Sequence, residues 1–219
     1  MNKRARDEEA KKARRQAILD AAERLLEERD VSMISVSQVA KACGLAKGTL
    51  YLYFKTKEEI FVALLKTQFG LWLKHIREVA VLPGMDLPQL MNRIVGFVAQ
   101  RPRFLALASV SSSILEQNLT YEVTASYKTD LIAQLQETGL LLEQVFKSLP
   151  TGEGVRMLMF SYAAILGMWQ LAEPPQIVRE VIEGEKLAAL EIDFEQQTVE
   201  ALSRMWMGLI AGASLSGRS

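Results

Sequence analysis

Apolar residues recur at helical spacing along nearly all of this 219-residue chain, and this pattern limits the possible folds more than any other feature. For example, Ile18, Ala22, Leu25 and Leu26 fall on one face of a helix, with charged residues on the other face. No convincing run alternates apolar and polar residues with a period of two between hairpin turns. The sequence therefore predicts an all-α protein.

Residues that start and end helices divide this pattern into segments. Ser35 followed by Gln38 is typical of a capping box, Gly44 suits the positive-φ end of a helix, and Thr56 is a good N-cap. The Pro174–Pro175 pair interrupts the chain before its last helix. We expect helices over about 8–29, 36–43, from 47, 57–81, 87–100, 102–113, 121–146, 155–171 and 194–211.

The net charge of zero conceals an uneven distribution. Residues 1–57 contain 13 Lys and Arg against 8 Asp and Glu, which gives +5, and the remainder contains 13 against 18, which gives −5. A basic N-terminal part favours contact with nucleic acid, and a chance distribution of surface charge is the alternative. Within it, the basic side chains before residue 16 either reach along DNA or are solvated; they are Lys3, Arg4, Arg6, Lys11, Lys12, Arg14 and Arg15.

Cysteine and histidine are too scarce for several classes of site. With one cysteine, Cys43, and one histidine, metal clusters and Cys–His pairs are poorly supported, and we expect neither an enzyme nor a cofactor. The start of the chain is charged, and the apolar run 157–171 is too short to span a bilayer. These features predict a cytoplasmic protein without a transmembrane segment.

Residues 35–60 read SVSQVAKACGLAKGTLYLYFKTKEEI. This segment closely resembles the helix-turn-helix signature of the tetracycline-repressor (TetR) family: a capped helix, A-x-x-x-G at the turn, then K-G-T-L-Y-x-Y-F and K-E-E-I. The resemblance covers roughly the first 65 residues, and the rest is similar only in length, helical content and order of elements. It implies a three-helix DNA-binding domain at 1–56 and a helical effector-binding and dimerisation domain at 57–219.

In a helix-turn-helix, the N-terminal residues of the second helix meet base edges while flanking groups bind phosphates. Leu50 and Phe54 are four residues apart and are expected to face inward. The predicted DNA-binding residues are Ser35, Ser37, Ala46, Lys47, Gly48, Thr49, Tyr51, Tyr53 and Lys57. Ala46 stands where the family commonly has serine, and Asp30 stands where a glycine commonly ends the first helix.

Such motifs usually act in pairs that meet successive major grooves about 34–36 Å apart, so the body should dimerise. The two C-terminal helices have more apolar residues than one buried face needs. The predicted interface residues are Leu158, Tyr162, Ile165, Trp169, Leu202, Met205, Trp206, Leu209 and Ile210.

Aromatic residues with few polar neighbours in the middle helices are typical of a pocket for a small lipophilic effector, although most such residues belong to ordinary cores. The predicted pocket residues are Trp72, His75, Phe97, Phe104, Glu116, Gln117, Asn118, Tyr121, Tyr127 and Phe160. The expected function is a ligand-responsive repressor that binds a palindromic operator as a homodimer. The alternative is a DNA-bound adaptor or nucleoid-associated protein whose body binds a protein partner.

Overall fold

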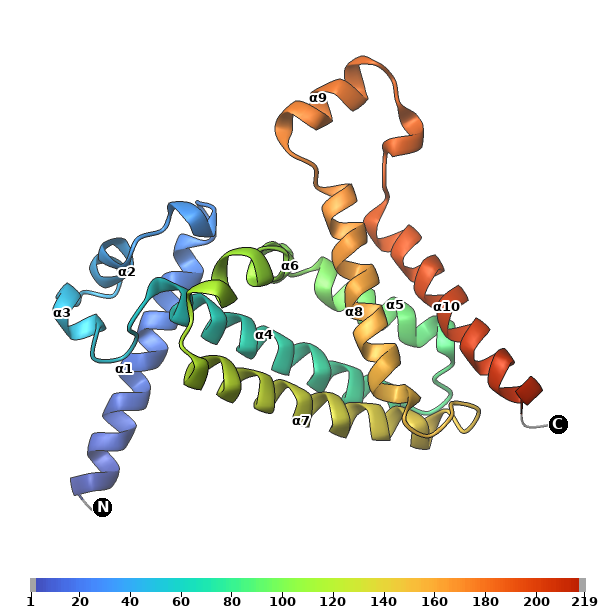
Figure 1. The fold of residues 1–219 in the computed structure, drawn as a ribbon, viewed down its shortest axis with the longest axis horizontal. Helices are drawn as coiled ribbons and strands as arrows, with labels where there is room; N and C mark the ends of the chain where they lie inside the picture. Colours follow the sequence, from blue (N-terminus) through green and yellow to red (C-terminus); the bar gives the residue numbers. More distant parts are fainter. Residues whose placement is uncertain (1–2, 217–219) are drawn as a thin grey trace. The chain divides into compact units, whose positions relative to one another are not determined.

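The computed structural model describes residues 3–216, and this part of the chain is helical without a β-strand (Figure 1). Its α-helices are α1 (Lys3–Leu25), α2 (Val36–Ala42), α3 (Lys47–Leu50), α4 (Lys57–Ala80), α5 (Leu87–Ala99), α6 (Pro102–Ser109), α7 (Tyr121–Val145), α8 (Glu153–Ala172), α9 (Gln176–Gly184) and α10 (Phe194–Ser216). The predicted fold class is confirmed. The side chains of Lys3 and Arg4 lie outside the described part.

Two compact units make up the chain. Unit 1 consists of Met1–Gln68 and Ala106–Lys128, and unit 2 consists of Phe69–Leu105 and Thr129–Ser219. Helices α4 and α7 each contribute residues to both units. In unit 1, α2 packs on α1 and α3, around buried side chains that include Ile18, Val39 and Leu50.

In unit 2, helix α10 packs on α5 and α8. Leu90, Leu158 and Trp206 are among the fully buried residues there, and Trp206 Nε1 donates a hydrogen bond of 2.9 Å to Ser161 Oγ. Satisfying this buried donor fixes the rotation of α10 against α8. The core of unit 2 is therefore built by contacts between its own helices.

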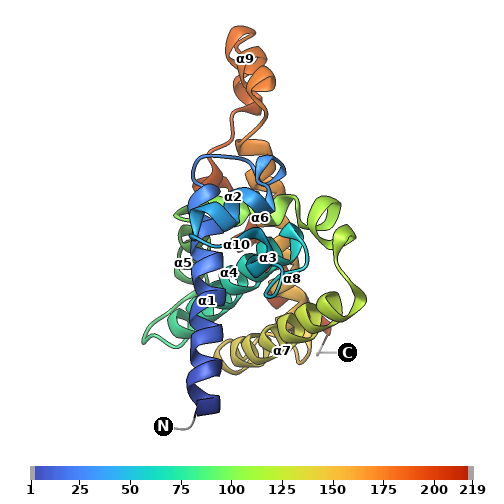
Figure 2. The ribbon, with the colours of Figure 1, turned by 90° about the vertical axis from the view of Figure 1, so that its left-hand side faces the viewer.

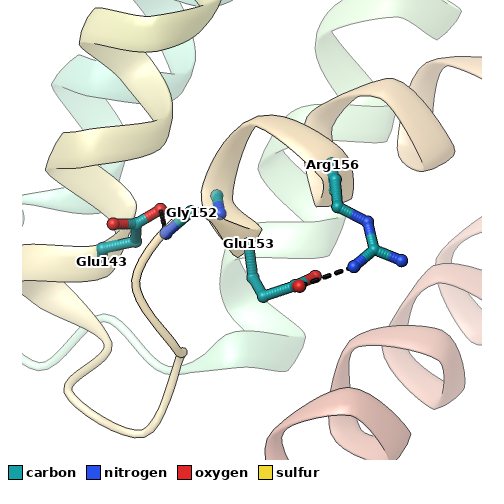
Figure 3. A network of polar contacts seen from close by, with 5 residues as sticks. Glu143, Gly152, Glu153 and Arg156 are labelled. Atoms are coloured by element: carbon teal, nitrogen blue, oxygen red, sulfur yellow. Dashed lines mark hydrogen bonds and ion pairs between the residues drawn. The ribbon is translucent and has the colours of Figure 1, made fainter.

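Helices α7 and α8 cross with backbone against backbone. A Cβ atom on Gly139 would lie 2.7 Å from the Val155 nitrogen, and one on Gly154 would collide with the Gly139 carbonyl oxygen. Close by, Glu143 Oε1 accepts hydrogen bonds from the N–H groups of Gly152 (3.0 Å) and Gly154 (2.9 Å), as Figure 3 shows in part. A side chain of α7 thus caps the first turn of α8.

Two local features differ from the sequence prediction. The helix expected over 102–113 ends at Ser109 and continues as a π-helical turn, Ser111–Leu115, followed by a 3-10 turn, Glu116–Asn118. Helix α9 was not predicted, because the Pro174–Pro175 pair was interpreted as an interruption; Pro175 is in fact the N-cap of α9. A proline at the start of a helix is compatible with helical geometry.

Helix α9 stands at the tip of an excursion between α8 and α10 and lies apart from both of them (Figures 1 and 2). Ile182 is its buried residue, whereas Ile177, Val178 and Val181 are 66%, 42% and 49% exposed. This arrangement leaves most of an apolar helix face open to solvent.

Helix α8 is long and apolar enough, by length and composition, to cross a membrane, and it is the one such helix in the described residues. Its most apolar 18-residue window has a mean hydropathy of 1.3, and 22% of that window is buried. The apolar run at 157–171 is too short by itself to span a bilayer, and α8 is longer than this run because it begins at Glu153 and ends at Ala172.

Candidate nucleic-acid interface

The candidate interface is built on α2, the turn at Gly44 and α3. Ser35 Oγ accepts a hydrogen bond from the Gln38 N–H (3.3 Å), and Gln38 Oε1 accepts one from the Ser35 N–H (2.8 Å). This confirms the predicted capping box. Gly44 has φ +67°, a conformation that favours glycine, and turns the chain from α2 into α3.

The inward side of α3 anchors it to unit 1. Leu50 and Phe54 are 0% and 3% exposed, which confirms their predicted inward orientation. The Phe54 N–H donates a hydrogen bond to the Leu50 carbonyl (3.1 Å), so the helical path continues beyond the last residue of α3. The outward side is therefore presented on a fixed support.

The predicted DNA-binding residues lie mainly on the solvent-facing surface of this support. Ser35, Ser37, Ala46, Lys47, Gly48 and Tyr51 are exposed, while Thr49, Tyr53 and Lys57 are half-buried. Ala46 provides no side-chain cap for α3. We refer to this set of nine residues as the α3 surface.

Gly48 is the most informative residue of the α3 surface. It lies within a helix and outside the positive-φ glycines, so its backbone conformation does not call for glycine. A Cβ atom there would meet nothing within 4 Å. Because glycine is less favourable than alanine in a helix, a glycine without any internal reason is consistent with close approach by an external molecule.

The two lysines of the α3 surface are held differently. Lys47 Nζ lies 5.9 Å from the centroid of the Tyr51 ring. Lys57 Nζ donates a hydrogen bond of 3.2 Å to the Ser32 carbonyl, which joins the start of α4 to the segment before α2. Lys57 thus has a structural contact in addition to its charge.

The sequence analysis missed two apolar residues exposed on unit 1. Leu52 is 77% exposed and Met33 is 69% exposed. Leu52 lies off the helical face defined by Leu50 and Phe54, so periodicity alone could have identified it as an outward residue. Both side chains are available for contact with a bound molecule.

The predicted effector residues belong to both units. In unit 2, Phe69 makes edge-on contacts with Phe104 (5.2 Å between centroids) and Tyr162 (5.0 Å), and Trp72 lies 6.4 Å from both Phe69 and Tyr162. Trp72 is 1% exposed, and its Nε1 has no hydrogen-bond partner among the residues that the structure describes. A buried donor of this kind is available to an acceptor on a ligand.

A second group in unit 2 consists of His75, Phe97 and Arg101. The His75 ring stacks on Phe97 at 4.7 Å, and Arg101 lies 3.7 Å above the same ring. Burial lowers the pKa of His75, and this effect outweighs the Arg93 carbonyl and the Glu78 carboxylate, which raise it.

The other predicted effector residues are dispersed. In unit 1, Glu116 forms an ion pair with Lys128 (2.8 Å) and Tyr127 is buried, whereas Gln117, Asn118 and Tyr121 are exposed. In unit 2, Phe160 is 45% exposed beneath Arg156. Their assignment to a pocket stays a prediction.

The predicted dimer residues differ in their exposure within one chain. Leu158, Ile165, Leu202 and Trp206 are 0–1% exposed, because they form the core between α8, α10 and α5 within one chain, and they offer no surface to a partner. The half-buried members of the set are Tyr162, Trp169, Met205, Leu209 and Ile210. Other apolar residues of α8 and α10 are more exposed, namely Met159, Phe160, Leu171 and Met207.

Comparison with known protein families accounts for both parts of the chain. Residues 18–64 match the model described as "Bacterial regulatory proteins, tetR family". Residues 69–213 match "Tetracyclin repressor-like, C-terminal domain". The two matches meet within α4 and together include the helix-turn-helix and most of the body.

Curated relatives are similar mainly in the N-terminal part. The "Fatty acid metabolism regulator protein" of Bacillus subtilis (strain 168) is 41% identical over 61 residues, which are 28% of this chain and 31% of that protein. An "HTH-type transcriptional regulator" of Staphylococcus aureus (strain USA300) is 31% identical over 68 residues, 31% of this chain and 37% of that protein. The matched region thus spans about a third of these relatives.

Solved structures share the fold of the whole chain. The TetR family repressor AlkX from Dietzia sp. strain DQ12-45-1b has a TM-score of 0.57 at 22% identity, covering 90% of this chain and 97% of its own. The fatty acid degradation regulator FadR from Bacillus halodurans has a TM-score of 0.51 at 21% identity, covering 91% and 95%. With both family models matched along its length, the chain belongs to the TetR family of transcriptional regulators.

Proposed function

We propose that this regulator is a cytoplasmic repressor that binds a palindromic operator as a homodimer and releases it on binding a small lipophilic effector. Its DNA-binding domain comprises residues 1–56 and its effector and dimerisation domain residues 57–219. The observation that carries DNA binding is the α3 surface: Gly48 is left open where nothing in the chain requires a glycine, between exposed Ala46 and Lys47 and half-buried Thr49. The experiment is selection of duplexes from a random library, followed by titration at several salt concentrations. Enrichment of an inverted repeat is expected, and failure to retain any duplex at low ionic strength overturns the proposal.

Dimerisation is supported by a hollow between α8 and α10. This hollow has a volume of about 490 Å³ and is lined mainly by small or apolar residues, among them Gly167, Leu171 and Ala201. Small residues let helices of a second copy approach closely, and a two-fold interface brings the same patch from each chain together. Ala201→Glu should give a monomer in analytical ultracentrifugation, whereas Glu200→Ala, its exposed neighbour, should leave a dimer. A monomeric wild-type protein contradicts this part.

An effector site in unit 2 is supported by the unpaired Trp72 Nε1 within the aromatic cluster. A lipophilic molecule with one hydrogen-bond acceptor suits an apolar site with a single donor. The Bacillus subtilis relative is named for fatty acid metabolism, so medium-chain and long-chain fatty acids are suitable probes. They should weaken operator binding by the wild type and act less on Trp72→Phe, which keeps a smaller aromatic ring and loses the N–H donor. Equal sensitivity of the two proteins excludes Trp72 as the anchor.

The second candidate is a DNA-bound adaptor whose body binds another protein. The exposed apolar face of α9 favours it, since such faces are common at protein interfaces. Genome-wide footprinting separates the two: a local repressor occupies one or a few promoters, and an adaptor or nucleoid-associated protein occupies many scattered sites.

A further inference from the structure

Unit 1 contains a hollow that shares Tyr53 with the α3 surface and lies outside the aromatic cluster around Trp72. Its volume is about 330 Å³, at the lower end of the range for small-molecule sites. Residues of four segments line it: Arg15 of α1, the end of the helix-turn-helix at Tyr53 and Phe54, the first half of α4, and the first turns of α7. All these segments belong to unit 1.

One side of the hollow is apolar and aromatic. Phe54 and Val62 are 3% exposed and Tyr127 is 4% exposed, so these side chains are held in place by their surroundings. Tyr53 is half-buried and lines the same space. We refer to Tyr53, Phe54 and Tyr127 as the aromatic wall. Its faces suit the apolar body of a small organic molecule.

Of the two cations that line the hollow, Arg15 and Lys66, Arg15 is the one without an ion-pair partner among the described residues. The Arg15 guanidinium lies 4.8 Å from the Phe54 ring centroid, and among the described residues no carboxylate forms an ion pair with it. Burial lowers the pKa of Arg15, which indicates partial removal of water from a group that stays charged. A guanidinium has five N–H donors, and here the aromatic ring satisfies none of them as an oxygen would.

The two carboxylates that line the hollow have other partners. Glu59 Oε2 accepts a hydrogen bond of 2.7 Å from the Lys55 N–H, as part of the cap of α4. Glu122 is bound by its own backbone N–H and the Thr120 hydroxyl, and these contacts lower its pKa. Neither carboxylate forms an ion pair with Arg15 in the described part of the chain.

We propose that this hollow binds a small organic monocarboxylate, whose carboxylate pairs with Arg15 and whose apolar body lies against the aromatic wall. A planar carboxylate matches the paired N–H groups of a guanidinium. Lys66 also lines the hollow but already has a partner within the described residues, so Arg15 is the cation that calls for one negative charge from a ligand. The site is distinct from the unit 2 cluster around Trp72. It gives the protein a second place where a metabolite can act.

Its effect on DNA binding rests on the proposed function. Tyr53 belongs both to the aromatic wall and to the α3 surface, and a bound anion cancels one positive charge of the basic N-terminal part. A ligand held against Tyr53 and the loss of one positive charge both oppose an approaching phosphate backbone, so the ligand lowers the affinity of the protein for DNA.

The first test needs no DNA. The probe is 3-phenylpropionate, and its neutral amide, 3-phenylpropanamide, is the matched compound. Methyl NMR should show shifts at Val62 and Val123, which line the hollow, and calorimetry should show the amide binding at least 10-fold more weakly. Arg15→Gln should lose at least 10-fold in affinity for the acid, while Arg14→Gln, an equally exposed neighbour that does not line the hollow, should bind as the wild type does.

Thermal unfolding checks that Arg15→Gln is folded, and Ser126→Trp, which fills the hollow from its exposed rim, provides a second variant that should not bind. No binding at millimolar concentration, equal binding of acid and amide, or undiminished binding by either variant overturns the proposal. If the NMR result holds but the wild type binds no duplex, the proposed function fails and this site stands. If the acid binds without weakening the protein–DNA complex, the inferred effect on DNA is wrong.

Discussion

Replacing Gly48 with alanine should stabilise the protein and weaken its binding to DNA. Gly48 lies in a helix without a positive φ, and a Cβ atom there meets nothing within 4 Å, so the chain accepts alanine without strain. Because unfolded alanine has less conformational entropy than unfolded glycine, the substitution raises the free energy of unfolding by about 0.5 kcal/mol. This value is near the lower end of the usual range of about 0.4–1 kcal/mol because the position is in the first turn of the helix. For a protein of this size the melting temperature rises by about 1–2 °C.

In the proposed complex with DNA, the same methyl group would lie on the α3 surface, where the duplex is expected to bind. Forcing a methyl group into a packed contact costs about 1–3 kcal/mol, so the affinity for a selected duplex should fall by about 5-fold to 150-fold. Fluorescence polarisation measures affinity and calorimetry measures melting. Gly96→Ala in α5 is the control, since its Cβ also meets nothing within 4 Å, and it should leave DNA binding unchanged. Because the two effects of Gly48→Ala have opposite signs, unfolding cannot explain lost binding; a variant that binds DNA as tightly as the wild type refutes the reasoning.

Three further outcomes follow from the contacts described. Lys47→Ala should reduce the slope of log affinity against log salt by about one unit, and an unchanged slope removes Lys47 from the phosphate contacts. Glu143→Ala should lower the free energy of unfolding by about 1–3 kcal/mol in urea titrations, because the N–H groups of Gly152 and Gly154 lose their acceptor, while the exposed Gln144→Ala should have little effect; equal stabilities would show that water replaces the carboxylate. Folding lowers the pKa of His75, so the unfolded chain binds a proton at this residue at a higher pH than the folded chain does. The stability present above pH 6.5, the unfolded value, should therefore decline as the pH falls from 6.5 toward the lower folded pKa. The difference in stability between wild type and His75→Gln should therefore change over that interval, and a constant difference between pH 7.5 and 5 contradicts the assigned burial.

The helix-turn-helix was predictable because its signals are local. Ser35 and Gln38 are three residues apart, Gly44 marks the turn, and Leu50 and Phe54 share a face, so each feature is legible without the rest of the fold. The π-helical turn at Ser111–Leu115 follows no comparable signal, and a helix was expected to continue into it.

The body was less predictable because periodicity finds an apolar face without showing what covers it. Leu158 and Trp206 lie on such faces, yet they pack inside one chain. Helix α9 was missed for a different reason. Its apolar residues have helical spacing, but two prolines precede them; these residues are Ile177, Val178, Val181 and Ile182. The contact between Arg15 and the ring of Phe54 could not be predicted, because the two residues are 39 positions apart and no local pattern connects them.

The crossing of α7 and α8 sets a limit on how this protein can change over generations. Where helices meet through side chains, a methyl group lost from one helix can be offset by a methyl group gained on the other. Gly139 and Gly154 have no side chains, so no such compensation is possible between them. Any amino-acid substitution at either glycine has to separate the two main chains and open a gap along their whole line of contact. In a saturation library these two positions should retain only glycine, while Gly96 in α5, where a Cβ atom meets nothing within 4 Å, should accept substitutions, so mutational tolerance in this body is decided residue by residue.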